Sequence, residues 1–127
     1  MNFISVTVSA VNDSGATVRL PGDATVMIPV KPKTLSVWDR ATLGIRPKHL
    51  RLDRNNPSVN GEVLVVERLG KETYLYIKIA GGETIVVQTD GDNPARIHDY
   101  VPIYINGELC HLFDQKGEVI PKLMVIT

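Results

Sequence analysis

The stretch TYLYIKIAGGETIVV, residues 73–87, decides the fold class. Its residues alternate between apolar side chains and polar or aromatic ones, which is the two-residue period of a strand that buries one face. Gly81 and Gly82 interrupt the alternation, and two adjacent glycines supply the positive backbone angles of a tight hairpin. The stretch therefore predicts two antiparallel strands joined by this turn. The inward-facing residues are expected to be Leu75, Ile77, Ile79, Ile85 and Val87.

The same alternation extends from this hairpin in both directions along the chain. Further short strands are predicted over residues 4–10, 16–20, 26–30, 41–45, 63–65, 101–105 and 109–113, with turns at 12–15, 21–23, 106–107 and 114–117. Pro47 favours a single helical turn through Leu50, and no long 3.6-residue period occurs. Evenly spaced short strands indicate an all-β fold, made of one or two antiparallel barrels with at most short helical turns. The seam between two strand groups is expected near residues 51–60.

The charge balance limits the classes of partner. Fourteen Lys and Arg residues match fourteen Asp and Glu residues, so no overall field attracts nucleic acid or an anionic membrane. The longest apolar stretches, such as GEVLVVE at 61–67, are much shorter than the roughly 20 residues that cross a bilayer. We therefore expect a soluble chain without a secretory signal. The single cysteine, Cys110, fits a reduced and buried thiol in a cytosolic protein.

The sequence carries no motif for catalysis. It has no GxxxxGK[ST] run to surround a phosphate chain, and nothing marks an activated serine or cysteine. The three histidines, His49, His98 and His111, are too scattered for a zinc site. We therefore predict that this chain is not an enzyme and holds no metal and no cofactor.

One local concentration of positive charge stands out in the neutral chain. Its members are Arg46, Lys48, Arg51 and Arg54. Such a cluster contacts an anion or an acidic partner, or it forms a solvated surface. Tyrosines on outward strand faces offer a second candidate surface, either for stacking on single-stranded nucleic acid or for packing against a partner. They are Tyr74, Tyr76 and Tyr104. The balanced charge favours a protein partner, and no nucleic acid is expected.

Three ordered motifs carry a resemblance to a known family. They are LGIRPKHL at 43–50, GEVLVVERLGKETYLYI at 61–77 and CHLFDQKGEVI at 110–120. Together they resemble the C-terminal regulatory region of the ATP-binding subunits of carbohydrate ABC importers, of the maltose and glycerol-3-phosphate transporter type. That region is an all-β TOBE domain, built as an oligonucleotide/oligosaccharide-binding-like barrel. The resemblance implies that residues 1–127 form a single TOBE regulatory domain, and that the ATPase domain of the parent protein lies upstream of this chain.

The resemblance also implies a function. It indicates a non-catalytic regulatory and dimerisation domain involved in sugar or sugar-phosphate import, whose parent protein binds ATP and Mg in the missing ATPase domain. The expected partners are a second copy of the ATP-binding subunit, the membrane subunits of the transporter and a cytoplasmic regulatory protein. The expected location is cytoplasmic, at the inner face of the cell membrane. Related TOBE modules bind oxyanions, so a module that senses an oxyanion or a sugar is the alternative.

Two groups of residues follow from the position of the motifs. The expected partner or dimer contacts are Trp38, Arg46, Lys48, His49, Tyr104 and Phe113. Two of these depart from the family pattern, because Lys48 replaces a usual glutamate and Trp38 stands where glycine is common. The turn ERLGKET is expected to be architectural, and its structural residues are Glu67, Leu69 and Gly70.

Overall fold

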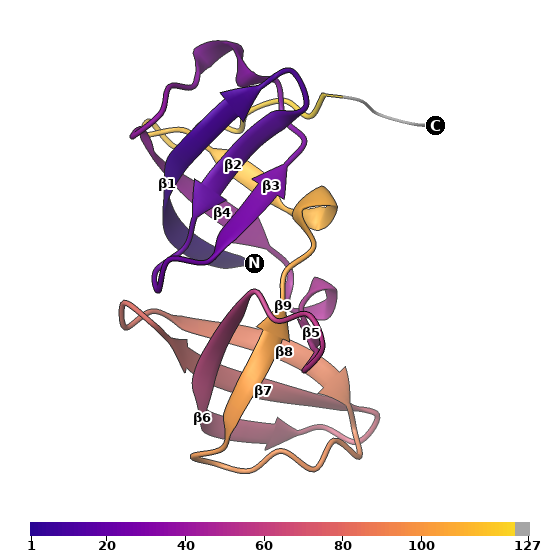
Figure 1. Cartoon of the computed structure of the whole chain (residues 1–127). Coiled ribbons are helices and arrows are strands. Elements are labelled where there is room, and N and C mark those ends of the chain that lie inside the picture. The colour runs from indigo at the N-terminus through magenta and orange to yellow at the C-terminus, as the bar shows by residue number, and fades with distance from the viewer. Residues whose placement is uncertain (124–127) are drawn as a thin grey trace. The chain divides into compact units, whose positions relative to one another are not determined.

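A computed structural model describes residues 1–123 and shows an all-β fold (Figure 1). The strands are β1 (Asn2–Asn12), β2 (Gly15–Arg19), β3 (Thr25–Ile28), β4 (Arg40–Ile45), β5 (Arg51–Leu52), β6 (Val59–Arg68), β7 (Glu72–Ile79), β8 (Thr84–Asp90), β9 (Tyr100–Tyr104) and β10 (His111–Phe113). Three 3-10 turns accompany them, namely η1 (Pro32–Thr34), η2 (Pro47–His49) and η3 (Gly107–Leu109). The prediction of antiparallel strands with only short helical turns is confirmed. Within residues 1–123, no helix is long and apolar enough to span a membrane.

The strands belong to two compact units. Unit 1 contains residues 1–2 and 46–105, and unit 2 contains residues 3–45 together with the chain from residue 106 onward. Unit 1 holds the five-stranded sheet β5-β9-β6-β7-β8, and unit 2 holds β10-β4-β1-β2-β3. The chain passes from one unit to the other between Ile45 and Arg46 and again between Ile105 and Asn106, and residues 51–60 lie in unit 1. That the whole chain acts as one regulatory domain stays a prediction.

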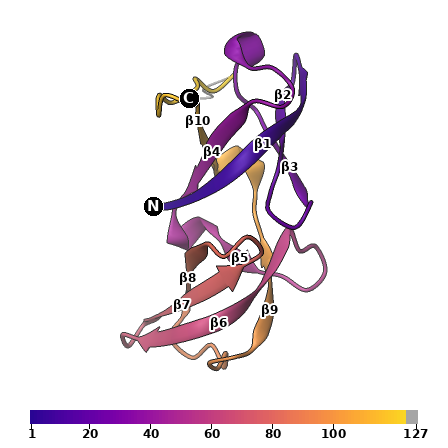
Figure 2. The same ribbon diagram turned by 90° about the vertical axis from the view of Figure 1, so that its left-hand side faces the viewer.

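The two units repeat one arrangement of strands. In sheet order, β4-β1-β2-β3 of unit 2 corresponds to β9-β6-β7-β8 of unit 1, and Figure 2 shows β1 between β4 and β2. The fifth strand is exchanged. The strand β5 follows β4 in the chain but pairs with β9, whereas β10 follows β9 but pairs with β4. Each sheet is therefore completed by a strand from the other repeat of the sequence.

The core of each unit lies on one face of its strands, because alternate residues of a strand point to the same side. Along β7 the burial alternates through the whole strand, which confirms the hairpin that residues 73–87 predicted. The fully buried side chains of unit 1 include Leu75, Ile77, Ile85 and Ile103. Those of unit 2 include Ile28, Leu43 and Leu112. Burying one large aliphatic side chain contributes about 1.5–3 kcal/mol, so these residues dominate the stability of the sheets.

The predicted strand over 109–113 starts later than the alternation suggests. Residues Gly107–Leu109 form η3, and the strand begins only at His111. The carboxamide of Asn106 accepts a hydrogen bond from the backbone N–H of Glu108 at 3.0 Å, which holds the chain in the turn. A side-chain cap of this kind competes with strand pairing, and an alternating apolar pattern does not reveal it.

Candidate functional site

Trp38 is the most exposed of the expected contact residues. Its side chain projects from a turn, Ser36–Asp39, and 74% of the residue surface is exposed. The turn is fixed to β1, since the N–H of Trp38 donates to the carbonyl of Val8 at 2.8 Å and the N–H of Val8 donates to the carbonyl of Asp39 at 2.8 Å. Trp38 has a φ of +77°, a backbone region that is unfavourable for a bulky residue. A large aromatic side chain is thus presented to solvent from a rigid and strained support.

Three further expected contacts, Arg46, Lys48 and His49, lie in η2 or directly before it, where the chain enters unit 1. Arg46 precedes the turn and Lys48 lies within it, and both side chains are exposed. His49 is half-buried, and its N–H donates to the carbonyl of Arg46 at 2.9 Å. Pro47 starts the turn because its fixed φ suits the first helical position. The sequence motif RPKH therefore places two cations on the surface and turns its histidine partly inward.

Tyr104 is less available for a partner than its outward position predicts. It is half-buried, and the guanidinium of Arg51 lies 4.8 Å above its ring. Arg51 and Tyr104 are directly opposite each other in the β5 and β9 pair. Arg51 also approaches Asp53, with 3.5 Å between Nη2 and Oδ2. One of the four cations in the basic cluster is therefore engaged within the protein.

Phe113 lies in unit 2 and packs against another aromatic residue. Its ring centroid is 5.9 Å from that of Phe3, at an interplanar angle of 64°, which is the edge-to-face geometry that aromatic pairs prefer. Phe113 is half-buried, and Phe3 is exposed. The expected contact set is thus divided, with Trp38 and Phe113 in unit 2 and the other four residues in unit 1. Their role as contacts stays a prediction.

The three expected architectural residues lie at the turn between β6 and β7. The N–H of Leu69 donates to the carbonyl of Glu72 at 2.9 Å, and Gly70 has a φ of +80° with open space around it. Glu67 is exposed and lies opposite Tyr74 in the strand pair. The hydroxyl of Tyr74 donates to Glu72 at 2.9 Å, and this hydrogen bond raises the tyrosine pKa. The architectural role of these residues stays a prediction.

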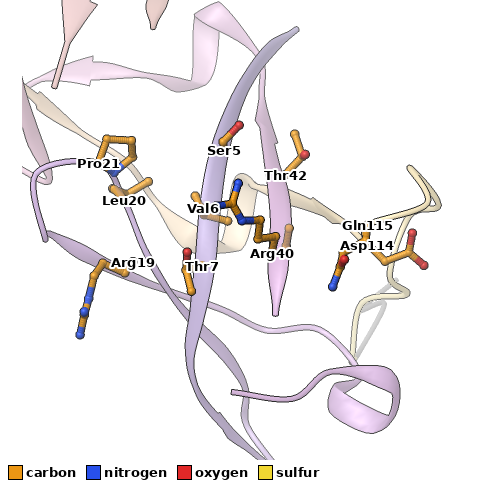
Figure 3. A pocket seen from close by; sticks show the side chains of 11 residues that line it. Ser5, Val6, Thr7, Arg19, Leu20, Pro21, Arg40, Thr42, Asp114 and Gln115 are labelled. Atoms are coloured by element: carbon orange, nitrogen blue, oxygen red, sulfur yellow. The ribbon is translucent and has the colours of Figure 1, made fainter. Parts of the chain in front are cut away.

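Two polar hollows were not predicted from the sequence. The first lies in unit 2, has a volume of about 490 Å³ and is drawn in Figure 3. Its polar lining consists of Ser5, Thr7, Arg19, Arg40, Thr42, Asp114 and Gln115. The second lies in unit 1, has a volume of about 580 Å³ and is lined by the charged residues Lys48, Arg51, Lys71, Glu72 and Asp90. The hollow of unit 2 is lined by outward-facing residues of β1 and β4. The alternation of the sequence predicts only that these residues face solvent, and it does not predict a hollow.

The described residues include neither a metal-binding cluster nor an activated thiol. Among residues 1–123, no three His, Cys, Asp or Glu side chains come close enough to hold a metal ion. Cys110 is fully buried and donates its S–H to the carbonyl of Asn106 at 3.4 Å. Burial raises the pKa of Cys110 to about 12, so its thiol is protonated at neutral pH and is a poor nucleophile.

Comparison with known proteins matches the family model described as the TOBE domain to residues 43–113. The maltose/maltodextrin import ATP-binding protein MalK of Vibrio parahaemolyticus is 35% identical over 125 residues, which cover 97% of this chain and 34% of that protein. The protein of the same name from Salmonella typhi is 34% identical over 126 residues, with the same coverage of both chains. The chain therefore spans about a third of the length of these relatives.

A solved structure shares the fold. The cytoplasmic molybdate-binding protein ModG, with molybdate bound, matches with a TM-score of 0.74 over 87% of this chain and 94% of that protein. The sequence identity is 14%, so this likeness concerns the fold alone.

Proposed function

Because this chain belongs to the TOBE domain family, we propose that it is the regulatory and dimerisation region of an ATP-binding subunit of a carbohydrate importer. The observation that carries the proposal is the 35% identity to a maltose/maltodextrin import ATP-binding protein along 97% of the chain. The region is non-catalytic, and ATP with Mg binds elsewhere in the parent protein. The parent is a cytoplasmic protein that works at the inner face of the membrane with the membrane subunits of the transporter.

The proposed partners are a second copy of the ATP-binding subunit and a cytoplasmic regulatory protein. Each unit supplies its own group of proposed contacts. In unit 2, exposed Trp38 is the aromatic anchor and half-buried Phe113 belongs to the same group. In unit 1, exposed Arg46 and Lys48 supply positive charge, and half-buried His49 and Tyr104 belong with them. A contact across a two-fold axis uses one patch twice, so a modest surface is sufficient.

A chimera tests the proposed function. The matching third of the Vibrio parahaemolyticus protein is replaced by residues 1–127, and maltose uptake is measured in cells that lack the native subunit. We expect uptake to be restored and to depend on the ATPase domain of the chimera. A chimera that is expressed and folded, hydrolyses ATP and yet supports no uptake would contradict the proposal.

Self-association of the chain tests the contact residues separately. We expect Arg46→Glu and Phe113→Ala to weaken dimerisation in sedimentation equilibrium by about tenfold each. Arg96→Glu is the matched control, because Arg96 is exposed and lies outside the proposed surface. Thermal unfolding identifies any variant that loses its fold. Dimerisation that is unchanged in both contact variants would exclude these residues as contacts.

Sensing of a small oxyanion or sugar is the second candidate function. The observation that favours it is the hollow of unit 1, where Lys48, Arg51 and Lys71 bring three cations to one depression. A thermal-shift panel of oxyanions, sugars and sugar phosphates separates the two candidates. A ligand at a hundred times its dissociation constant adds about 2.7 kcal/mol to the stability. A panel without any shift would exclude the sensing function for these ligands.

A further inference from the structure

Two cations in the hollow of unit 2 have no partner among the residues that the structure describes. Arg19 is the last residue of β2 and Arg40 is the first residue of β4, and both are exposed. Within residues 1–123, neither guanidinium makes a hydrogen bond or an ion pair. Asp114 is the acidic residue of the lining, but its Oδ1 already accepts the N–H groups of Lys116 and Glu118 at 2.9 and 3.0 Å. The two arginines are therefore available to an external negative charge.

The two guanidinium groups are arranged for separate negative groups. Strand β1 lies between β2 and β4, so the backbones of Arg19 and Arg40 are about 10 Å apart. In Figure 3 the side chain of Arg40 extends toward β1, whereas that of Arg19 points away from it. The donors do not converge on one point, as a site for a single phosphate requires. They fit two negative groups at separate positions along an extended ligand.

The hollow continues toward the turn that presents Trp38. A neighbouring depression shares Arg40, Asp114 and Gln115 with it and reaches Leu35 and Asp39. Trp38 lies between these residues in the chain and is followed two positions later by Arg40. Trp and Arg are the residues that most often carry the binding energy of protein interfaces. The two depressions therefore adjoin at Arg40, and residues on both sides of Trp38 in the chain line the second one.

The same row of residues in unit 1 lacks this character. There Lys78 takes the place of Arg19 and Glu62 that of Thr7, as the equivalent strand pairs show. Tyr100 takes the place of Arg40, because Val8 donates to Asp39 as Val63 donates to Asp99, and the two residues follow these aspartates. Glu62 supplies a negative charge between the two outer positions, and its Oε2 lies 2.8 Å from Nδ1 of His98. At this row of residues, unit 2 therefore carries two arginines and no carboxylate, whereas unit 1 carries one lysine and one glutamate.

We infer that the face of unit 2 formed by Arg19, Arg40 and Trp38 docks an extended acidic segment of a protein partner. This inference rests on the proposed function, because it names the chemistry of a partner of the regulatory region. The segment contributes two carboxylates at separate positions, one for each arginine, and lies beside the indole of Trp38. The neighbouring depression is lined by three acidic and two basic residues, whereas the first hollow is lined by two arginines and one aspartate, so the acidic contact is assigned to the first hollow.

Fluorescence of Trp38 tests the inference, because it is the single tryptophan of the chain. The full chain is titrated with a peptide of alternating Glu and Ala, about ten residues long, which spans about 33 Å when extended. We expect a saturable change of Trp38 emission, and a Kd that rises about tenfold in Arg19→Glu and in Arg40→Glu. Lys78→Glu is the matched control in unit 1 and is expected to change the Kd less than about twofold.

Three results would overturn the inference. The first is an absence of saturable binding, and the second is an equal loss in Lys78→Glu, which would indicate unspecific attraction. The third is equal binding of inorganic phosphate or of a thymidine oligonucleotide, which would indicate another class of ligand. The chimera and the dimerisation assay report on the proposed function independently. Restored uptake together with absent peptide binding would reject this inference alone, and peptide binding without uptake would reject the proposed function alone.

Discussion

The turn Ser36–Asp39 of unit 2 and the turn Arg96–Asp99 of unit 1 have the same backbone hydrogen bonds but carry different side chains. In unit 2, the N–H of Trp38 donates to Val8 at 2.8 Å and the N–H of Val8 donates to Asp39 at 2.8 Å. In unit 1, the backbone N–H of His98 donates to the carbonyl of Val63 at 2.7 Å, and the N–H of Val63 donates to the carbonyl of Asp99 at 2.8 Å. The third residue of each turn has a positive φ, +77° in Trp38 and +75° in His98.

The side chains at this third position have different surroundings. Both side chains are exposed, but Nδ1 of His98 lies 2.8 Å from Oε2 of Glu62, whereas Trp38 carries a large apolar ring at the same position. The repeated hydrogen bonds show that the strained backbone belongs to the architecture of both units. The strain at Trp38 is therefore not a sign of function by itself. What distinguishes unit 2 is the large apolar ring at this position, together with two exposed arginines, Arg19 and Arg40, that have no partner among residues 1–123.

The largest expected effect is on the alkylation rate of Cys110. Cys110 follows η3 as Leu50 follows η2, and both residues are buried. Because burial raises the pKa of Cys110 to about 12, iodoacetamide at pH 8 should modify the native chain at least about a hundredfold more slowly than the urea-unfolded chain. Mass spectrometry over time measures both rates. Equal rates would show that Cys110 is not held in a core like that around Leu50.

The same thiol gives the stability a pH dependence. An unfolded thiol has a pKa of about 8.5, so between that pH and about 12 the unfolded chain releases a proton that the folded chain keeps. Its contribution to stability is complete below this range and is lost as the pH rises through it. Cys110→Ala should therefore lose less stability than the native chain between pH 9 and pH 11, as measured by urea unfolding.

The two equivalent 3-10 turns differ at their first residue, which is Gly107 in η3 and Pro47 in η2. A Cβ at Gly107 would overlap the carbonyl oxygen of Met27 on β3, whereas the corresponding turn of unit 1 carries Pro47. We expect Gly107→Ala to lower the free energy of unfolding by about 2–3 kcal/mol, because the backbone of β3 or η3 must shift. Pro47→Ala is the control and should cost less than about 1 kcal/mol. Similar losses would mean that both turns lie equally close to their strands.

The aspartates that close the two turns should behave alike. Asp39 accepts the N–H of Ser36 at 2.9 Å, and Asp99 accepts the N–H of Arg96 at 2.9 Å. Asp39→Ala and Asp99→Ala should each lower the free energy of unfolding by about 1–2 kcal/mol in urea titrations. Asp39→Asn and Asp99→Asn keep an acceptor and should lose less. A loss confined to one unit would argue against a common turn design.

The smallest expected effect is a change in stability when the third residue of either turn, Trp38 or His98, is replaced by glycine. Trp38→Gly should stabilise the chain by about 0.5 kcal/mol, since glycine adopts a positive φ without strain and little packing is lost. His98→Gly should gain less, because the contact with Glu62 disappears. Differential scanning calorimetry of both variants with the native chain measures the difference. A destabilised Trp38→Gly would show that the indole packs against its own unit.

The strands could be predicted from the sequence because a period of two residues reports which face of a strand is buried. Leu75, Ile77 and Ile85 are buried as their alternation requires. The positions of turns at adjacent glycines followed from local backbone geometry. Of the expected contact residues, Trp38, Arg46 and Lys48 are exposed, whereas the other three are half-buried.

The repeat and the hollow could not be predicted, because both depend on pairings between distant residues. Between residues 36–52 and 96–112, three aligned positions carry the same residue, namely Asp39 and Asp99, Ile45 and Ile105, and Leu52 and Leu112. Some of the remaining positions, such as Leu43 and Ile103, share only an apolar character, which is common to many strands, and others share none. Arg51 and Tyr104 face each other because β5 pairs with β9, and these strands lie about 50 residues apart in the sequence. No local sequence pattern could indicate this contact.

The exchanged fifth strand limits how the protein can be divided. A chain that stopped after Ile45 would leave β4 without its neighbour β10, and one that started at Arg46 would carry β10 without its neighbour β4. Expressing either half alone should therefore expose an unpaired sheet edge, which invites aggregation. Co-expression of the two fragments offers a practical route to split reporters, since each fragment supplies the strand that the other lacks.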